Sequence, residues 1–208
     1  MRVSAIRSAA EWVRRDADRV LAARAVLGVG LDAMGSTINA DYRLPDSRFV
    51  TGLGQVQWVE RIEEGTGQVV ARADFQLASS RLPSVEQFPV GGVASVRGYR
   101  ENTLIRDEGG SASVEYRTRI GRLAVPGLSR DPADGAVQLA LFIDAGAGRD
   151  KGGRSDSLVS FGGGLRWSAG GGLEAHVYKG KPLKNEPQGG NTLQDHGIHF
   201  RIAWQRRF

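Results

Sequence analysis

Apolar and polar residues alternate with a period of two along most of this chain. The stretch 68–77 shows this most clearly, with Val69, Ala71, Ala73, Phe75 and Leu77 on one face and Gln68, Val70, Arg72, Asp74 and Gln76 on the other. Successive side chains of a β-strand point to opposite faces, so this period predicts a strand with one apolar face. The period recurs in the stretches 21–32, 49–62, 111–120, 137–146, 159–167, 173–178 and 198–208. We therefore predict an all-β fold of about eight strands, antiparallel because turns and loops join them.

The face opposite the apolar one carries charges in the middle of strands. These residues are Arg24, Arg72, Asp74, Glu115, Arg117, Arg119, Arg166 and Arg201. Aromatic residues gather near strand ends, at Tyr116, Trp167, Trp204 and Phe208. Alternation alone would also suit a soluble sandwich. A charged face that lines a watery lumen, together with aromatic girdles, favours a transmembrane β-barrel.

Composition narrows the classes further. None of the apolar runs in the 208 residues approaches the roughly 20 that a transmembrane helix needs. Cysteine is absent, which excludes disulfides and thiolate metal sites. The net charge of +5 comes almost wholly from arginine. A basic chain can bind nucleic acid or an acidic membrane surface, or it can line a pore with arginine.

The first residues predict neither a signal peptide nor a complete strand. Residues 1–18 carry charges where a signal peptide has an uninterrupted apolar region. Acidic residues after Arg14 and Arg15 also argue against a twin-arginine signal. We expect residues 1–18 to be a strand end or loop at a truncated N-terminus, and residues 19–208 to form the barrel domain.

One long segment, residues 81–107, lacks the alternation. It contains V-G-G-V-A-S-V-R-G-Y-R, residues 90–100, in which a glycine-rich turn presents Arg97 beside Gly98 and Tyr99. Downstream, F-I-D-A-G at residues 142–146 places Asp144 inside a strand, on the face opposite its apolar residues. The loop can bring Arg97 to Asp144 if it folds back into the lumen, and its glycines permit that bend.

These motifs resemble the haemolysin secretion/activation family, the outer-membrane transporters of two-partner secretion (ShlB/FhaC/HecB type). The resemblance covers residues 19–208 and includes G-L-D-A-M-G-S-T-I-N, P-D-S-R-F, D-F-Q-L-A, E-Q-F-P-V-G-G-V-A-S-V-R-G-Y-R-E-N and F-I-D-A-G. V-R-G-Y alone is a weak match of four letters. Its order and distance relative to F-x-D-x-G make the pair specific.

The resemblance implies a pore that exports one partner protein across the outer membrane of a Gram-negative bacterium, without nucleotide hydrolysis. Family barrels have roughly sixteen strands, within the usual outer-membrane range. Two periplasmic domains precede the barrel and recognise the partner. The resemblance also implies a lumen latch motif in which Arg97 pairs with Asp144, made of Val96, Arg97, Gly98, Tyr99, Phe142, Asp144 and Gly146. It implies no enzyme activity and no cofactor, and its partners are the secreted passenger protein, outer-membrane lipid and the barrel-assembly machinery.

The chain departs from the family by lacking the plug helix, the periplasmic domains and half of the strands. An open half-barrel would leave two unpaired edges in lipid, which is not viable. We therefore expect the C-terminal half of a larger barrel, present here as a fragment. The alternative is a closed eight-stranded barrel with a structural or adhesive role.

Other functions have weaker support in the sequence. A nucleic-acid binder would group arginines and aromatics on one sheet face, whereas here they oppose each other. No serine, histidine and acid form a set that suggests a hydrolase. His196 and His199 precede a strand rather than share a helix face, so we expect no metal site. The runs Gly162–Gly164 and Gly170–Gly172 lack the lysine of a phosphate loop and favour strand bending or close packing.

The end of the chain predicts an assembly signal. Trp204 and Phe208 share the apolar face of the last strand, and the final residue is aromatic, as in proteins handed to the outer-membrane insertase. Arg206 on that face is tolerable near the interface, where a lipid-facing arginine costs about 0–1 kcal/mol. Deletion of Phe208 should therefore lower the amount of assembled barrel. Heat-modifiable migration on gels measures this, and unchanged barrel levels would contradict the assignment.

Overall fold

The structure is a computed structural model that describes residues 1–41, 43–62, 66–184 and 190–205. Its strands are β1 (Ser4–Arg15), β2 (Arg19–Leu31), β3 (Val50–Ile62), β4 (Gly67–Ala78), β5 (Phe88–Val90), β6 (Leu104–Arg106), β7 (Glu108–Arg122), β8 (Ala136–Arg149), β9 (Ser155–Gly170), β10 (Leu173–Pro182) and β11 (Ile198–Trp204). A single turn of 3₁₀ helix, η2, covers Ser84–Glu86. Among these residues no helix has the length and hydropathy that a membrane crossing requires.

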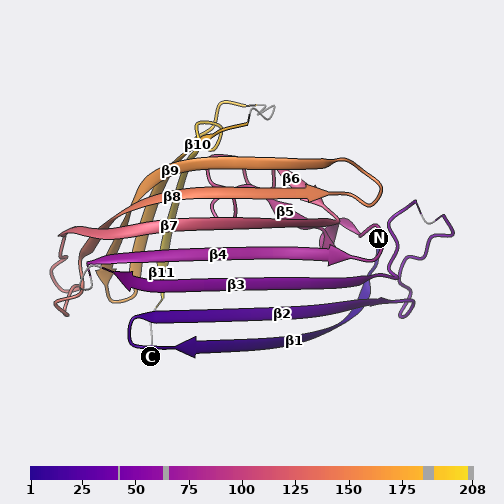
Figure 1. The fold of residues 1–208 in the computed structure, drawn as a ribbon, viewed down its shortest axis with the longest axis horizontal. Coiled ribbons are helices and arrows are strands. Elements are labelled where there is room, and N and C mark those ends of the chain that lie inside the picture. The colour runs from indigo at the N-terminus through magenta and orange to yellow at the C-terminus, as the bar shows by residue number, and fades with distance from the viewer. Residues whose placement is uncertain (42, 63–65, 185–189, 206–208) are drawn as a thin grey trace.

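Nine of the strands form one antiparallel sheet in the order β1-β2-β3-β4-β7-β8-β9-β10-β11. Each strand therefore pairs with its neighbours in the chain, except that β5 and β6 form a separate hairpin between β4 and β7. The sheet curves strongly, so that β10 and β11 pass behind β2 to β9 (Figure 1). In the part of the chain that is described, β1 and β11 are each paired on one side only. The all-β antiparallel fold predicted from the alternation is confirmed.

The segment 1–18 differs from its prediction. It contains β1, which pairs with β2 along its whole length, from Ser4↔Leu31 to Arg15↔Val20. The main sheet consequently has nine strands, one more than the alternation indicated. The pattern was obscured because small residues such as Ser8 and Ala10 occupy the face that Ile6 and Trp12 share.

The C-terminal end of β10 differs too. The alternation in the sequence ends at Tyr178, but the strand continues to Pro182. Lys179 pairs with Gly163 on β9 and with Ile198 on β11, and Gly180 pairs with Gly162. Glycine and lysine carry no apolar signal, so the pairing could not be read from hydrophobicity. Phe208 lies outside the described residues.

The convex face of the sheet is apolar and exposed. Its side chains are between 42% and 71% exposed and include Leu27, Val56, Phe75, Leu77, Val114, Leu141, Ile143, Phe161, Leu165, Val177, Phe200, Ile202 and Trp204. Soluble monomers rarely expose contiguous apolar patches larger than a few hundred Å². A continuous apolar band around the outside is typical of a barrel wall in contact with lipid.

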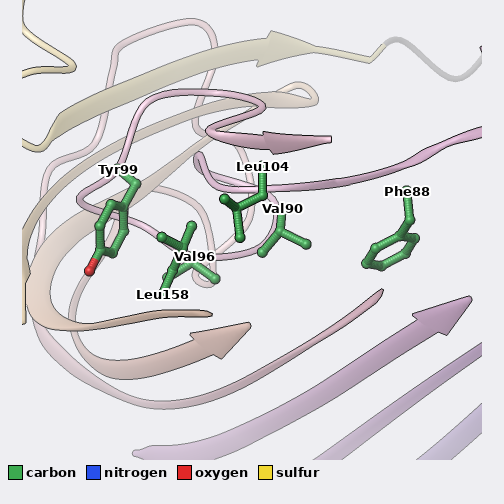
Figure 2. Packing of buried hydrophobic residues seen from close by; sticks show 6 residues of the cluster. All are labelled: Phe88, Val90, Val96, Tyr99, Leu104 and Leu158. Carbon is green, nitrogen blue, oxygen red and sulfur yellow. The ribbon is translucent and has the colours of Figure 1, made fainter. Parts of the chain in front are cut away.

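The buried core lies on the concave face instead. Phe88, Val90, Val96, Tyr99 and Leu104 come from the segment between β4 and β7, and they pack together with Leu158 of β9 (Figure 2). A second small cluster joins Ala140, Phe142 and Tyr178, with Val93 packed against it. The segment between β4 and β7 thus supplies most of the apolar interior and lies inside the curve of the sheet.

The two ends of the sheet differ in the length of their connections. The connections β1–β2, β3–β4, β7–β8 and β9–β10 lie at one end, whereas the longest connections, β2–β3, β4–β7 and β10–β11, lie at the other. Barrels of bacterial outer membranes have short periplasmic turns and longer extracellular loops. Residues 79–107 therefore enter the concave face from the end of the sheet that has the long connections.

The two faces lead to a prediction about arginine substitutions. Ile143→Arg places a charge on the convex face in the middle of β8, where lipid contact makes a charge cost about 2–4 kcal/mol. We expect a large loss of assembled barrel in outer-membrane preparations. Gln57→Arg adds the same side chain on the concave face of β3 and should leave assembly near normal. Equal loss in both variants would contradict the assignment of faces.

Candidate functional site

Residues 79–107, here called the inner loop, form the candidate site. The loop leaves β4 and forms the hairpin β5–β6 (Figure 1). Residues 91–99, which connect these two strands, face the concave wall. Its tip is a tight turn in which Gly91 N donates to Ser95 Oγ at 2.8 Å and Gly92 N donates to the Val96 carbonyl at 3.1 Å. Gly91 and Gly92 have φ of 113° and 98°, a region that glycine adopts without strain. The turn aims the next residue, Arg97, at β7 and β8.

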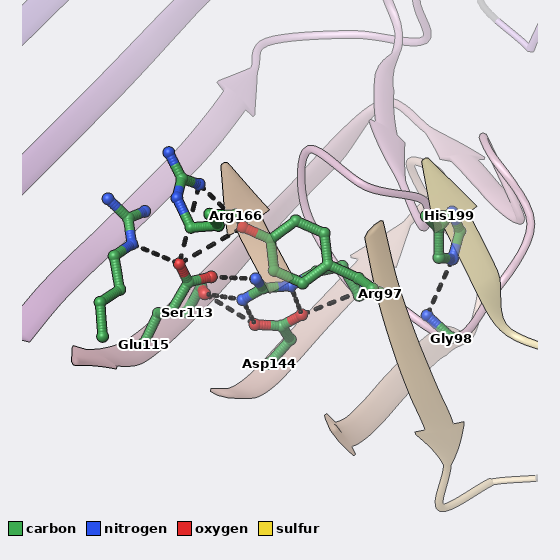
Figure 3. Close-up of polar contacts among 9 residues, drawn as sticks. Arg97, Gly98, Ser113, Glu115, Asp144, Arg166 and His199 are labelled. Atoms are coloured by element: carbon green, nitrogen blue, oxygen red, sulfur yellow. Dashed lines mark hydrogen bonds and ion pairs between the residues drawn. The ribbon is translucent and has the colours of Figure 1, made fainter. Parts of the chain in front are cut away.

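Arg97 and Asp144 form a three-point contact (Figure 3). The guanidinium donates from Nε to Asp144 Oδ2 at 2.8 Å and from Nη2 to Oδ1 at 2.8 Å, and the backbone N of Arg97 donates to Oδ2 at 3.0 Å. Ser113 Oγ donates to Asp144 Oδ1 at 2.6 Å and accepts from Arg97 Nη2 at 2.9 Å. Arg97 is 6% exposed and Asp144 1%. The structure therefore brings together the two residues that the sequence paired.

Glu115 is a second carboxylate at Arg97, and the sequence did not identify it as a partner. It accepts from Arg97 Nη1 and from Arg117 Nε, and the Tyr178 hydroxyl lies 3.5 Å from its Oε1. Arg166 Nη1 lies 4.0 Å from the same oxygen and donates to the Tyr178 hydroxyl at 2.8 Å. Glu115 belongs to the charged face of its strand, so the alternation placed it inward. Its contact with Arg97 depends on the three-dimensional path of the loop.

Two aromatic rings complete the site around the guanidinium. Arg97 Cζ lies 3.6 Å from the ring centroid of Phe142 and 5.0 Å from that of Tyr178. The two rings meet edge to face, with centroids 5.9 Å apart. A cation over an aromatic face gains about 2 kcal/mol or more when both are desolvated. Phe142 was expected beside the ion pair, and the structure places it there.

Tyr99 has a different role from the expected one. The resemblance grouped Tyr99 with Arg97 and Asp144 in the latch motif, whereas the structure places it in the apolar cluster with Val96 and Leu158, where it is fully buried. Its hydroxyl has two acceptors within reach for its one proton, the Val159 carbonyl oxygen at 2.9 Å and the Lys184 carbonyl oxygen at 3.1 Å. The hydroxyl oxygen also accepts from Lys184 N at 3.1 Å. Tyr99 therefore fastens the loop to β9 and to the segment after β10.

Two glycines of the motifs, Gly146 and Gly98, let the loop lie close to the wall. A Cβ at Gly146, the last residue of the F-x-D-x-G motif, would lie 2.5 Å from Val90 Cγ1 and 2.9 Å from Val96 Cγ2. A Cβ at Gly98, whose φ is 94°, would lie 3.0 Å from the carbonyl carbon of Gly180. These positions have no room for a side chain, so the motif glycines are explained by contact between the loop and strands β8 and β10.

Gly98 also connects the loop to the last strand. Its backbone N donates to Nε2 of His199, which lies on β11 and is 5% exposed. His196 has Nε2 2.9 Å from Asn191 Oδ1. Both histidines therefore have polar contacts within the fold. Within the described ranges no three His, Cys, Asp or Glu side chains are grouped to hold a metal ion.

The outer part of the inner loop contacts the connection between β10 and β11. Arg100 Nε lies 3.4 Å from Asp195 Oδ1, and Glu101 N donates to the Gln194 side-chain oxygen at 3.4 Å. Thr192 donates its backbone N and its hydroxyl to Asp195, both at 2.7 Å, and these bonds lower the pKa of Asp195. The carboxylate therefore stays charged opposite Arg100 at neutral pH.

Comparison with known families identifies the class of this protein. The model of the family described as haemolysin secretion/activation protein ShlB/FhaC/HecB matches residues 2–167, well over half of the chain. The chain belongs to this family, as its motifs predicted. The family consists of outer-membrane β-barrel proteins of two-partner secretion.

A solved structure supports the same fold. CdiB from Escherichia coli matches with a TM-score of 0.77 at 20% sequence identity, over 96% of this chain and 36% of CdiB. At this identity the likeness shows the fold, and the chain spans about a third of the length of CdiB. No curated protein matches the chain in a sequence search.

The glycine contacts lead to a prediction for the loop. Gly98→Ala adds a Cβ against Gly180 at a positive φ, a strain of about 1–3 kcal/mol. A loss of 1–2 kcal/mol in seating corresponds to roughly 5–30-fold more open loop. We expect tryptic cleavage after Arg97 or Arg100 to become faster by about that factor. Gly52→Ala, where a Cβ meets nothing within 4 Å, is the matched control. If the two variants are cleaved alike, Gly98 does not seat the loop.

Proposed function

We propose that this chain forms part of the pore wall, and the loop that closes the pore, of an outer-membrane transporter that exports one partner protein. The observation that carries this proposal is the inner loop, seated in the concave wall by Arg97 on Asp144. Family membership supports the assignment to two-partner secretion. The proposed location is the outer membrane of a Gram-negative bacterium. The proposed partners are the passenger protein, membrane lipid and the barrel-assembly machinery.

The contacts of the inner loop suit a closure that can be released. Apolar packing of Val96, Tyr99 and Leu158 is combined with polar contacts to β8, β9 and β11. The polar contacts face an interior that water can enter, so they can be exchanged for hydration when the loop moves. In this proposal the loop shuts the pore at rest and leaves the wall while the passenger chain passes.

Pairing of the two sheet edges decides how the barrel closes. In an antiparallel meander of nine strands the first and the last run in the same direction, so β1 could join β11 only as a parallel pair. Single-chain bacterial barrels have even strand numbers, which keeps every pair antiparallel. We propose that β1 and β11 pair with strands outside this sequence. The second candidate, a small self-closed barrel with a structural or adhesive role, requires the parallel pair.

The ion pair leads to a prediction for secretion. Removing one partner of a desolvated pair costs roughly 3–5 kcal/mol, and a wet lumen reduces this. Even a loss of 1.4 kcal/mol changes the ratio of seated to released loop about tenfold. Arg97→Ala and Asp144→Ala should leave a folded barrel that secretes roughly tenfold less partner, because a loop that is no longer held on the wall lies free in the lumen, in the path of the passenger. The measurement is partner protein in the culture medium of cells that produce each variant.

Two further variants sharpen this test. The swap Arg97→Asp with Asp144→Arg should restore secretion only in part, because Ser113, Glu115 and Phe142 are arranged for one orientation of the pair. Arg48→Ala removes an exposed arginine whose ion pair with Asp46, at 3.0 Å, lies in another loop, and should not change secretion. Normal secretion by both single variants of the buried pair would show that the proposed closure is wrong.

A further inference from the structure

A basic cavity lies in the concave wall beside Arg97. It has a volume of about 310 Å³ and is lined by polar side chains of β4, β7, β9, β10 and β11 together with residues 93–95 of the inner loop. The charged residues around it are Arg72, Arg97, Arg117, Arg166, Arg201, Glu115 and Glu174. Five guanidinium groups therefore face two carboxylates, and positive charge predominates in the cavity.

The carboxylates present do not neutralise these arginines. Arg97, Arg117 and Arg166 converge on the single carboxylate of Glu115, and Arg97 also binds Asp144. Glu174 lies 3.6 Å from His176 Nε2. Within the ranges that the structure describes, Arg72 and Arg201 form no ion pair. Uncompensated positive charge that lines a cavity attracts an anion.

Arg166 supplies a second, independent indication. Its Nη1 donates to the Tyr178 hydroxyl, but its Nε is buried and has no hydrogen-bond partner among the described residues. A buried donor without an acceptor is costly, so native structures nearly always satisfy such groups. An anion in the cavity would supply the acceptor that Arg166 lacks. Guanidinium groups bind carboxylates through two parallel hydrogen bonds, so a carboxylate fits this donor set.

The cavity is reached from the short-turn end of the sheet. A second cavity of about 760 Å³ shares Glu174 and Arg201 with it. Its other lining residues include Arg130 and Asp134 of the β7–β8 connection, and Gly171 and Gly172 of the β9–β10 turn. This end is periplasmic by the rule of short turns. Anything that enters from that side meets Arg130 and Arg201 before it reaches the inner loop.

We propose that this cavity binds the carboxylate side chains of the exported polypeptide as it enters from the periplasmic end. The proposal rests on the proposed function and adds the chemistry of the segment that the pore first engages, an acidic stretch of the passenger. Membrane lipid cannot be the source of the anion, because the cavity lies on the concave face whereas lipid contacts the convex one. The arginines on β4, β9 and β11 hold the incoming chain beside the inner loop.

Binding of a labelled oligoglutamate tests the proposal. The protein as cells produce it is purified in detergent, and fluorescence anisotropy measures its affinity for the oligoglutamate at low and moderate salt. The triple variant Arg72→Gln, Arg166→Gln, Arg201→Gln should bind at least tenfold more weakly. Arg24→Gln is the matched control, since Arg24 lies on the concave face of β2 beside Glu11 and does not line the cavity. This variant should bind as the unaltered protein does. Heat-modifiable migration confirms that each barrel is folded. If the triple variant does not fold, Arg72→Gln and Arg201→Gln are measured singly, because neither breaks an ion pair.

Three outcomes would overturn the proposal. The first is that the triple variant binds oligoglutamate as tightly as the unaltered protein does. The second is that a labelled oligolysine binds more tightly than the oligoglutamate. The third is that free glutamate competes as strongly, per carboxylate, as unlabelled oligoglutamate does. The last would mean a site for small anions and not for a polypeptide. The binding measurement does not involve secretion. Normal secretion by the Arg97 and Asp144 variants would therefore refute the proposed closure of the pore, and the binding result would still be judged separately.

Discussion

The guanidinium of Arg97 is the interaction on which the arrangement of the inner loop depends. It lies between two carboxylates, Asp144 and Glu115, and against the face of Phe142. These partners come from β7 and β8, so the loop can bind only when both strands are in register, with Ser113 opposite Asp144 and Glu115 opposite Phe142. Lysine could not replace it, because a single ammonium lacks the planar fork that reaches two acceptors and stacks on a ring. Assembly of the wall and seating of the loop are therefore coupled.

Glycine provides the room that this interaction needs. A Cβ at Gly162 would lie 2.6 Å from Phe142 Cζ, and one at Gly164 would lie 2.4 Å from the Tyr178 ring, so the two rings beside Arg97 occupy space that β9 leaves empty. The glycine run in β9, interpreted from sequence as a place for close packing, has that role. Gly180 on β10 also allows close packing, because a Cβ there would lie 2.6 Å from Gly98 N of the loop. A wall of larger residues would hold the loop away from Asp144.

The sequence predicted what depends on local pattern and failed where the outcome depends on pairing between distant strands. The period of two identified the apolar and charged faces, and the motifs identified Arg97 and Asp144. Glu115 and Tyr178 were missed as partners because each is placed by strand register and by the path of the loop. β1 was missed because its face alternates in size more than in polarity. Tyr99 was misplaced because the residue after a tight turn can point to either side, and here it enters the apolar cluster.

In the proposed function, the same contacts hold the loop firmly and still allow its release. If the loop withdraws, Glu115 keeps Arg117 and has Arg166 nearby, so its charge remains compensated. Among the described residues, Asp144 then keeps only the hydroxyl of Ser113 and must be hydrated by water from the lumen. The cost of release is therefore concentrated on one carboxylate, below the roughly 3–5 kcal/mol of a pair broken in a dry interior. Arg97 is hydrated as it leaves, which lowers the cost further. In the proposed function, a closure of this strength stays shut at rest, and a polypeptide that gains a few favourable contacts in the lumen displaces it.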